Sequence, residues 1–328
     1  MKPSSQEELK SALVQLFSED REIAILTHKN PDGDGLASAL ALQQLFSDRF
    51  AGIHIILEEP APKNYDFLDV RKRTSVYDPH QSFPHIVMLD CHEVKRLGRC
   101  ALLVPGAEKV IAIDHHIAGE IIPGACTYLD PDAVSVGFIL YSIFRDEIWS
   151  RESGIRRYLA TCCYVSIIND TDNFQNLNLN TATFQTCTEL VSMGINPGRI
   201  SQNFFARSIR EIRYAGDILS SMEIRAEGRI LLLYSSLDLV DRHGVTMAAN
   251  SKFTRWVKGA RGVEVVIFLQ QVDNDLYRIS LRSQMIDVRE IAARFGGGGH
   301  SRAAGFESNE SMDNIKEKLF REIEKRLP

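Results

Sequence analysis

The stretch Val110-Ile111-Ala112-Ile113-Asp114-His115-His116 joins four apolar residues to an acidic residue and two histidines. The apolar part is typical of a buried β-strand, so the polar part falls at the carboxyl end of that strand. Two other short apolar runs continue in the same way: residues 22–27 precede His28, and residues 86–89 precede Asp90. This repetition predicts that polar side chains from several strands meet at one place.

Apolar runs alternate with helical patterns through the first two-thirds of the chain. The expected strands are 22–27, 53–57, 86–89 and 109–113, and the expected helices are 36–46, 134–144 and 157–168. Such alternation predicts an α/β fold with a mostly parallel sheet and helices on both faces. Ligands of such sheets bind beyond the carboxyl ends of the strands, where His28, Asp90 and Asp114 fall.

The last third of the chain predicts a second, smaller α/β domain across a cleft. Helices over 183–193 and 200–208 lead away from the first domain, and a break falls at 194–198. Two β-rich runs, 263–272 and 277–281, flank the turn-like Asp273-Asn274-Asp275, and helices are expected over 287–295 and 312–327. The predicted organisation is a catalytic domain over 1–195, a helical linker over 196–220 and a substrate-binding domain over 221–328.

Composition excludes several classes of protein. The chain has 328 residues, 44% hydrophobic and 25% charged, as expected for two globular domains. Its net charge of −5 argues against binding to long duplex nucleic acid. It has no apolar run near the length of a membrane span and no apolar signal core at its start. Its six cysteines fit neither a zinc site nor a disulfide framework, so we expect reduced, structural cysteines and a cytoplasmic location.

Carboxylates and imidazoles recur at several of the expected strand and helix ends. They are His28, Asp32, Asp34, Asp90, Asp114, His115, His116 and Asp170. Each has an ordinary alternative when taken alone, such as a helix N-cap, a strand-end cap or a histidine satisfied in the core. Their joint order favours one metal site. This mixed ligand set suits Mn²⁺ best, with Mg²⁺ or Co²⁺ as alternatives, and no thiolate is placed for structural zinc.

The order of these residues resembles the DHH phosphoesterase superfamily. The run Gly296-Gly297-Gly298-Gly299-His300-Ser301-Arg302 and the following Ala303-Ala304-Gly305 resemble the signature of the DHH-associated C-terminal domain. Together the two resemblances span most of the chain. The branch that it resembles contains bacterial oligoribonucleases and pAp phosphatases, together with cyclic-dinucleotide and linear-dinucleotide phosphodiesterases.

The resemblance implies a site for two metal ions. Asp90 and Asp170 would bridge the ions. His28 and Asp32 would complete one ion, and Asp34 and His115 would complete the other. His116 would face the scissile phosphoryl group or help to protonate the leaving oxygen, and Asp114 would orient a histidine or cap the turn. His92 is not a motif position and is expected to be structural or to support the ligands, while Asp172 stands where the superfamily often has glycine.

The glycine run is expected to bind substrate. The N–H groups of Gly297, Gly298 and Gly299, with a helix start over 301–304, would face a phosphate, and His300 and Arg302 would add donors. The alternative for the glycines is a flexible surface loop. Arg282-Ser283 resembles the superfamily's arginine near the substrate, although an exposed, ion-paired arginine is the alternative.

The resemblance implies a manganese-dependent phosphoesterase acting on very short oligoribonucleotides and on nucleotide 3′-phosphates such as pAp. A cyclic-di-AMP or pApA phosphodiesterase is the alternative, and a non-catalytic nucleotide-binding module is a remote one. Related pyrophosphatases lack the glycine-rich signature. Expected partners are short oligoribonucleotides, pAp or dinucleotides, with no long duplex and no membrane; the oligomeric state stays open, with a homodimer as one alternative.

Overall fold

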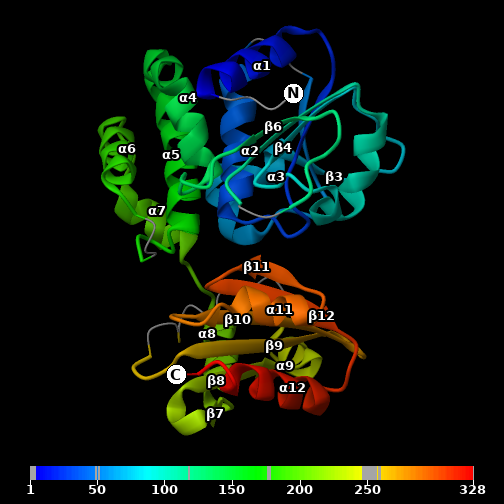
Figure 1. Cartoon of the computed structure of the whole chain (residues 1–328). Helices are drawn as coiled ribbons and strands as arrows, with labels where there is room; N and C mark the ends of the chain where they lie inside the picture. Colours follow the sequence, from blue (N-terminus) through cyan, green and yellow to red (C-terminus); the bar gives the residue numbers. More distant parts are fainter. Residues whose placement is uncertain are drawn as a thin grey trace. The chain divides into compact units, whose positions relative to one another are not determined.

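The computed structural model of the chain describes residues 5–48, 50, 52–116, 119–175, 179–245, 257 and 260–327. The chain divides into two compact units, Met1–Ala206 and Arg207–Pro328 (Figure 1). The division falls within the segment 196–220 that was predicted as a linker. Helix α7 (Pro197–Phe204) belongs to the first unit and helix α8 (Ile209–Ser220) to the second.

The predicted helix over 200–208 corresponds to α7, but its predicted bounds are wrong. Helix α7 ends at Phe204, and Phe205 is its C-cap. Ser208 then begins α8 as an N-cap, with Glu211 completing a capping box. The sequence signal for this second helix start is a serine followed three residues later by glutamate.

The first unit contains a six-stranded parallel sheet in the order β3-β2-β1-β4-β5-β6. Its strands are β1 (Ile23–Leu26), β2 (Ile53–Leu57), β3 (Thr74–Val76), β4 (His85–Leu89), β5 (Lys109–Asp114) and β6 (Cys126–Leu129). The four predicted strands are confirmed, and the two edge strands β3 and β6 were not predicted. Both edge strands are short and only partly buried, so they lack a continuous apolar run.

Helical segments cover both faces of this sheet. They are α1 (Gln6–Ser18), α2 (Gly33–Phe46), η1 (Lys63–Leu68), α3 (Val70–Arg73), η2 (Val94–Gly106), α4 (Val136–Ser150), α5 (Ser153–Asp170), α6 (Thr181–Ser192) and α7. One face packs against α1, α2, α4 and α5, and the other packs against the 3₁₀ segment η2. None of the described helices is long and apolar enough to cross a membrane.

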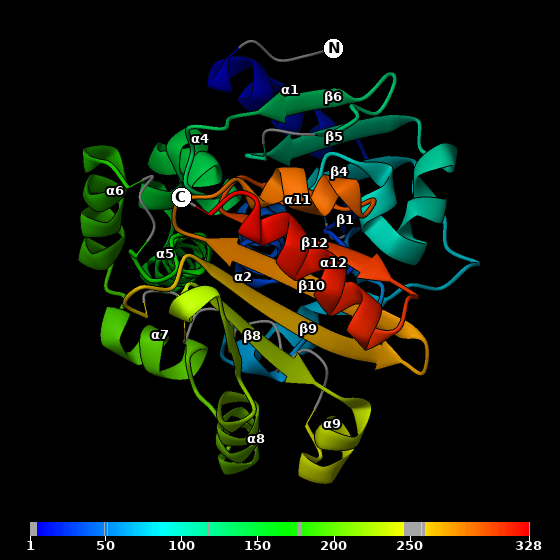
Figure 2. The ribbon, with the colours of Figure 1, turned by 60° about the horizontal axis from the view of Figure 1, so that its bottom comes forward.

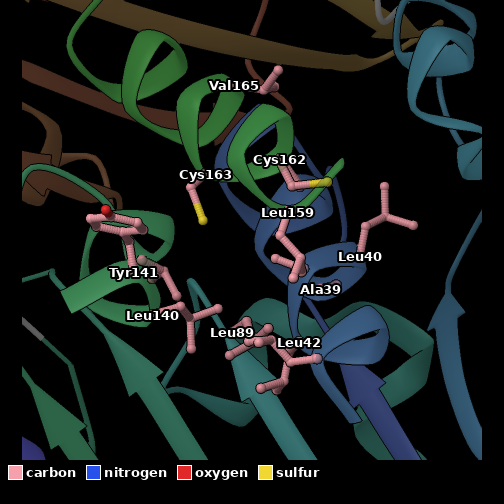
Figure 3. Close-up of a cluster of buried hydrophobic side chains, with 14 of the residues drawn as sticks. Ala39, Leu40, Leu42, Leu89, Leu140, Tyr141, Leu159, Cys162, Cys163 and Val165 are labelled. Atoms are coloured by element: carbon pink, nitrogen blue, oxygen red, sulfur yellow. The ribbon is translucent and has the colours of Figure 1, made fainter. Parts of the chain in front are cut away.

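Helix α2 is buried around almost its whole circumference, because it packs against both the sheet and other helices. Figure 3 shows Ala39 and Leu42 of α2 gathered with Leu89 of the sheet and Leu159 of α5. Cys162 and Cys163 lie in the same cluster, as predicted for packing residues. All six cysteines are free thiols.

The second unit contains a six-stranded sheet in the order β11-β12-β10-β9-β8-β7. Its elements are α8, β7 (Glu223–Arg225), η3 (Ala226–Gly228), β8 (Ile230–Ser235), α9 (Leu237–His243), β9 (Val265–Asp273), β10 (Leu276–Ser283), α11 (Val288–Arg294), β11 (Gly298–His300), β12 (Ala303–Ser308) and α12 (Met312–Glu324). Neighbouring strands are antiparallel except β8 and β9. Helices α11 and α12 pack on one face, where Figure 2 shows α12 lying across the strands, and α8 and α9 pack on the other. The predicted fold class is confirmed.

The glycine run forms a strand of a β-hairpin, so the predicted helix start over 301–304 is wrong. Strand β11 pairs with β12, and residues 301–302 form the turn. A Cβ added at Gly297 would lie 2.2 Å from the Gly305 carbonyl oxygen. A Cβ added at Gly299 would lie 2.5 Å from the Ala303 carbonyl oxygen, and Gly299 has a φ of +137°. Two of the glycines are therefore needed for the close approach of two strands.

Candidate metal centre

Three neighbouring strands of the first sheet place polar residues at the same edge. His28 lies two residues beyond β1, Asp90 directly follows β4, and Asp114 ends β5. The chain passes from β1 to β2 on one side and later returns to β4 on the other side of β1. A crevice at such a change of strand order is where open α/β sheets bind ligands. Asp90 has a φ of +57°, an unusual backbone conformation for a residue that is not glycine.

The start of α2 brings two more carboxylates to this edge. Asp32 is the N-cap of α2, and its Oδ1 accepts hydrogen bonds from Asp34 N at 2.9 Å and Gly35 N at 3.4 Å. The ordinary alternative, an N-cap, is therefore also correct for Asp32, and it leaves the second carboxylate oxygen for other partners. Gly33 permits close packing here, since an added Cβ would lie 2.9 Å from Asn169 and Phe204.

The six predicted metal ligands form two clusters that share Asp90, and a third possible ligand group joins Asp90 to Asp114, His115 and His116. One contains His28, Asp32 and Asp90, and the other contains Asp34, Asp90, His115 and Asp170; within each, one ligand atom per residue lies within 4.8 Å of the others. His28 Nε2 lies 3.3 Å from Asp90 Oδ2, and His115 Nε2 lies 2.8 Å from Asp170 Oδ2 and 3.7 Å from Asp90 Oδ1. Asp170 is grouped with the second cluster alone, so its role as a second bridge stays a prediction.

The chemistry of these residues fits divalent cations. Asp90 is buried, and its Oδ1 has no hydrogen-bond partner among the residues that the structure describes. Burial, followed by the charges of Asp34 and Asp32, raises the pKa of Asp90 well above its ordinary value. Burial and Asp170 raise the pKa of Asp34 to about 7. Crowded, buried carboxylates with adjacent imidazoles are the ligands that hard and borderline divalent cations select.

Asp34 is held by donors from three helices. Its carboxylate accepts hydrogen bonds from Ser38 Oγ at 3.0 Å, Ser166 Oγ at 2.6 Å and Val136 N at 2.8 Å. These bonds join α2 to α5 and to the N-terminal turn of α4. Neither serine was predicted as a supporting residue, because the two lie far apart in the chain and belong to helical patterns.

Asp114 contacts His92 and both of the histidines that follow it in the chain. Its carboxylate lies 2.5 Å from His92 Nδ1 and 2.7 Å from His116 Nδ1, and it accepts a hydrogen bond from His115 N at 2.7 Å. Burial alone would raise the pKa of Asp114, but the hydrogen bonds from His116 and His92 outweigh burial and hold that pKa far below its usual range. Asp114 therefore stays ionised. His92 is buried beside it and supports the site, as expected for a residue outside the motif.

Asn169 is a supporting residue that was not predicted. Its side-chain Nδ2 donates hydrogen bonds to Asp32 Oδ2 at 2.8 Å and to Asp170 Oδ1 at 2.7 Å. The side chain is buried at the C-terminal end of α5. One amide thus connects a carboxylate of each cluster. Its position directly before Asp170 was the available signal.

The segment after Asp170 turns through a left-handed backbone. Asp172, Asn173 and Phe174 have φ values of 51°, 56° and 64°. Glycine adopts this conformation without the Cβ penalty, which explains why glycine is common at the position of Asp172 in the superfamily. Asp172 is buried, and Phe174 stacks on Phe184 of α6.

In the second unit, the hairpin brings predicted substrate-binding residues into neighbouring register. Arg282 pairs with Ala303, and Ala303 pairs with His300. The side chain of His300 lies outside the described part of the structure. Arg282 Nη1 donates to the Leu281 carbonyl at 2.9 Å, and Arg302 Nη1 lies 3.4 Å from the Ile286 carbonyl.

Ser283 has a structural role in the same region. Its Oγ accepts hydrogen bonds from Met285 N at 3.2 Å and Ile286 N at 2.8 Å, which stabilises the turn into α11. This does not test the predicted contact of Ser283 with substrate. It does explain the presence of a hydroxyl residue at the end of β10.

Two family models match the chain in the regions just described. The DHH family N-terminal domain matches residues 22–167, and the DHHA1 domain matches residues 231–325. The chain combines a DHH domain with a DHHA1 domain. The resemblance drawn from the sequence is confirmed, and the metal-ligand clusters lie in the first unit, which contains the DHH match.

Curated relatives of this DHH–DHHA1 protein carry the names of hydrolases. The chain is 20% identical over 299 residues to the Bacillus subtilis bifunctional oligoribonuclease and PAP phosphatase NrnA, covering 90% of this chain and 92% of that one. It is 26% identical over 290 residues to the Thermus thermophilus protein of the same name, covering 86% and 83%. It is 23% identical to the Listeria monocytogenes cyclic-di-AMP phosphodiesterase PdeA, covering 97% of this chain but 48% of that one. The expected class, a phosphoric ester hydrolase, is confirmed at this level.

A solved structure has the same fold over nearly the full length. It is an exopolyphosphatase-related protein from Bacteroides fragilis, with a TM-score of 0.85 and 22% identity, covering 96% of this chain and 95% of that one. This likeness supports the fold alone.

Proposed function

We propose that the chain is a manganese-dependent phosphoesterase that hydrolyses very short oligoribonucleotides and nucleotide 3′-phosphates such as pAp. The observation that carries the proposal is Asp90. Its carboxylate is buried and belongs to both ligand clusters, and its Oδ1 has no hydrogen-bond partner among the described residues. A carboxylate placed in this way suits a bridge between two cations.

Each of the two clusters would hold one cation. His28 and Asp32 would hold one ion, Asp34, His115 and Asp170 would hold the other, and Asp90 would be shared. When bound, the cations would lower the pKa of a water molecule and neutralise the phosphoryl oxygens. The mixed carboxylate and imidazole set favours Mn²⁺, with Mg²⁺ or Co²⁺ as alternatives.

His116 has a different proposed role. Its Nδ1 lies 2.7 Å from Asp114 Oδ1, so a neutral His116 would donate from Nδ1 and contact the phosphoryl group through Nε2. His116, held in place by Asp114, would deliver a proton to the leaving oxygen. His92, on the other oxygen of Asp114, would hold the carboxylate in place.

The relatives support the choice of substrate. The two proteins named as oligoribonuclease and PAP phosphatase are covered over 92% and 83% of their lengths. The cyclic-di-AMP phosphodiesterase is covered over 48%, so much of that protein has no counterpart in the match. Short RNA and pAp are therefore the leading substrates, and cyclic-di-AMP or pApA is the alternative.

We propose that Arg282, Ser283, the hairpin glycines, His300 and Arg302 of the second unit bind substrate. Substrate length should then matter, because the net charge of −5 offers no extended basic track for a long backbone. We expect turnover to fall as RNA lengthens beyond a few nucleotides. Arg302→Ala should raise KM for short RNA while the protein keeps its metal.

One experiment separates these substrates. Purified protein with Mn²⁺ is given pAp, a pentaribonucleotide, a long single-stranded RNA, pApA and cyclic-di-AMP in parallel, with Asp90→Ala as the inactive control. We expect turnover of pAp and the pentaribonucleotide above that of the other three. A preference for cyclic-di-AMP or pApA would support the alternative, and equal rates on short and long RNA would overturn the proposed length limit.

A further inference from the structure

A cavity of about 530 Å³ lies in the first unit, away from the metal ligands. It is bounded by the N-terminal half of α5, by the end of η1, by residues 194–196 and by α7. Thr161 is the cavity residue on α5 that comes latest in the chain, nine residues before Asp170. At 1.5 Å per residue, it lies roughly 14 Å along the helix from that ligand. The cavity has the volume of a small-molecule site.

The polar lining of this cavity is positively charged. Arg157 and Arg199 both line it, and no aspartate or glutamate is among the lining residues. Neither guanidinium has an ion-pair partner within the described part of the chain, whereas Arg145, Arg151 and Arg71 in the same unit are all paired with carboxylates. Two cations without a counter-charge at one cavity favour an anion, and guanidinium groups suit phosphate.

The helix ends near the cavity are already satisfied by the protein itself. Glu152 caps α5 by accepting from Gly154 N at 3.2 Å, and Asn196 caps α7 by accepting from Arg199 N at 2.9 Å. The recognition of an anion would therefore depend on the two arginine side chains rather than on open helix N-termini.

The remaining lining is apolar and aromatic. Leu68, Ile195 and Ile200 are buried, and Phe67 and Tyr158 are partly exposed. The Tyr158 hydroxyl donates to the Leu68 carbonyl at 3.0 Å, which fixes the ring. Arg73 lies over the same ring, with 4.7 Å between its Cζ and the ring centroid. A ligand with a flat apolar part beside its phosphate would contact both the arginines and the apolar, aromatic lining.

We propose that this cavity binds a nucleoside monophosphate, with the phosphate on Arg157 and Arg199 and the base over Phe67 and Tyr158. The choice of adenosine 5′-monophosphate rests on the proposed function, because hydrolysis of pAp releases AMP and inorganic phosphate. The site would then let the protein bind a product of its own reaction outside the metal centre.

The test is calorimetric titration of AMP into the full-length protein with EDTA present, so that the metal centre contributes no phosphate binding. Inorganic phosphate and adenosine are titrated in the same way. The double variant Arg157→Ala/Arg199→Ala is compared with a control double variant, Arg213→Ala/Arg261→Ala. The control removes two exposed arginines of the second unit, so the two double variants have the same net charge. Both sites are exposed, so folding should be retained, and thermal melting checks this.

We expect AMP to bind the wild type more tightly than phosphate or adenosine does, and the Arg157/Arg199 variant to bind AMP at least tenfold more weakly. The control double variant should bind AMP with wild-type affinity. Phe67→Ala should weaken the binding of AMP but not that of phosphate. Equal AMP affinity in the two double variants, or no AMP binding by the wild type at millimolar concentration, would overturn the proposal. Turnover of pAp with Mn²⁺ is measured separately, so failure of the proposed function is distinguishable from failure of this site.

Discussion

Replacement of Asn169 by alanine tests whether one buried amide holds the two metal-ligand clusters together. The Asn169 amide donates hydrogen bonds of 2.8 Å to Asp32 and 2.7 Å to Asp170. Asn169→Ala removes both bonds and leaves the two carboxylates without their shared donor. We expect the two carboxylates to separate, because like charges repel each other once the bridging amide is lost.

The expected magnitude follows from the type of bond. A hydrogen bond to a charged group contributes about 1.5–3 kcal/mol, and loss of a residue that supports a metal ligand typically lowers metal affinity about 10- to 100-fold. We therefore expect Asn169→Ala to weaken Mn²⁺ binding by about 10- to 100-fold. Asn169→Asp has the same shape but replaces the donor by another carboxylate, so it should also lose the fixed spacing.

Calorimetry of the metal-free protein with Mn²⁺ measures this affinity, and electron paramagnetic resonance of the loaded protein reports the coupling between the ions. Asn314→Ala, on the exposed surface of α12, is the control. A purely structural role for Asn169 would lower the melting temperature without changing Mn²⁺ affinity or the coupling. Two Mn²⁺ ions bound to Asn169→Ala with wild-type affinity and coupling would refute the reasoning.

Three further outcomes follow from the geometry. His115→Ala should lose Mn²⁺, whereas His116→Ala should keep it and lose about 10²- to 10⁴-fold in turnover, and equal metal loss in both would show that their roles are not separable. Gly299→Ala should destabilise the second unit by roughly 1–3 kcal/mol in thermal or urea unfolding, while Gly298→Ala, whose Cβ would meet no atom within 4 Å, should change little; equal effects would contradict the hairpin account. Because the pKa of Asp34 is raised to about 7 in the metal-free protein, Mn²⁺ must displace a proton below that pH. Its affinity should fall as the pH is lowered from 8 to 6, and a pH-independent affinity in buffered titrations would exclude this linkage.

Much of the candidate metal centre could be predicted because its residues sit at positions that sequence patterns mark. His28, Asp90 and Asp114 follow apolar runs, and parallel strands bring such positions to one edge. Asp32 combines two roles, N-cap and candidate ligand, so the two interpretations were never exclusive. The resemblance to the superfamily then predicted which of these residues would bind the same ion.

The supporting residues could not be predicted in the same way. Ser38 and Ser166 reach Asp34 from different helices, and their contact depends on how α2 packs against α5. Such tertiary contacts leave no local periodic signal in a single sequence. Asn169 directly precedes Asp170 in the sequence, but its two hydrogen-bond acceptors are determined by the packing of α5 beside the start of α2.

The structure of the glycine run was predicted wrongly from a rule that is correct for isolated segments. Glycine weakens strands in general. Gly299 nevertheless lies in β11 and Gly297 directly precedes it, because β12 leaves no room for a Cβ at either position. The close approach is a property of two strands, and the sequence of one of them does not reveal it. Similarly, Ser208 was predicted as the last residue of one helix but is the N-cap of the next.

The stoichiometry of Mn²⁺ in the wild type and in Asp90→Asn tests the central claim most directly. The wild type should bind two Mn²⁺ ions per chain with a spin-coupled resonance spectrum. Asp90→Asn keeps the shape of the side chain but removes the shared charge, so it should lose the coupled pair and turnover of pAp while it retains its fold. Two coupled ions in Asp90→Asn, bound with wild-type affinity, would contradict the account.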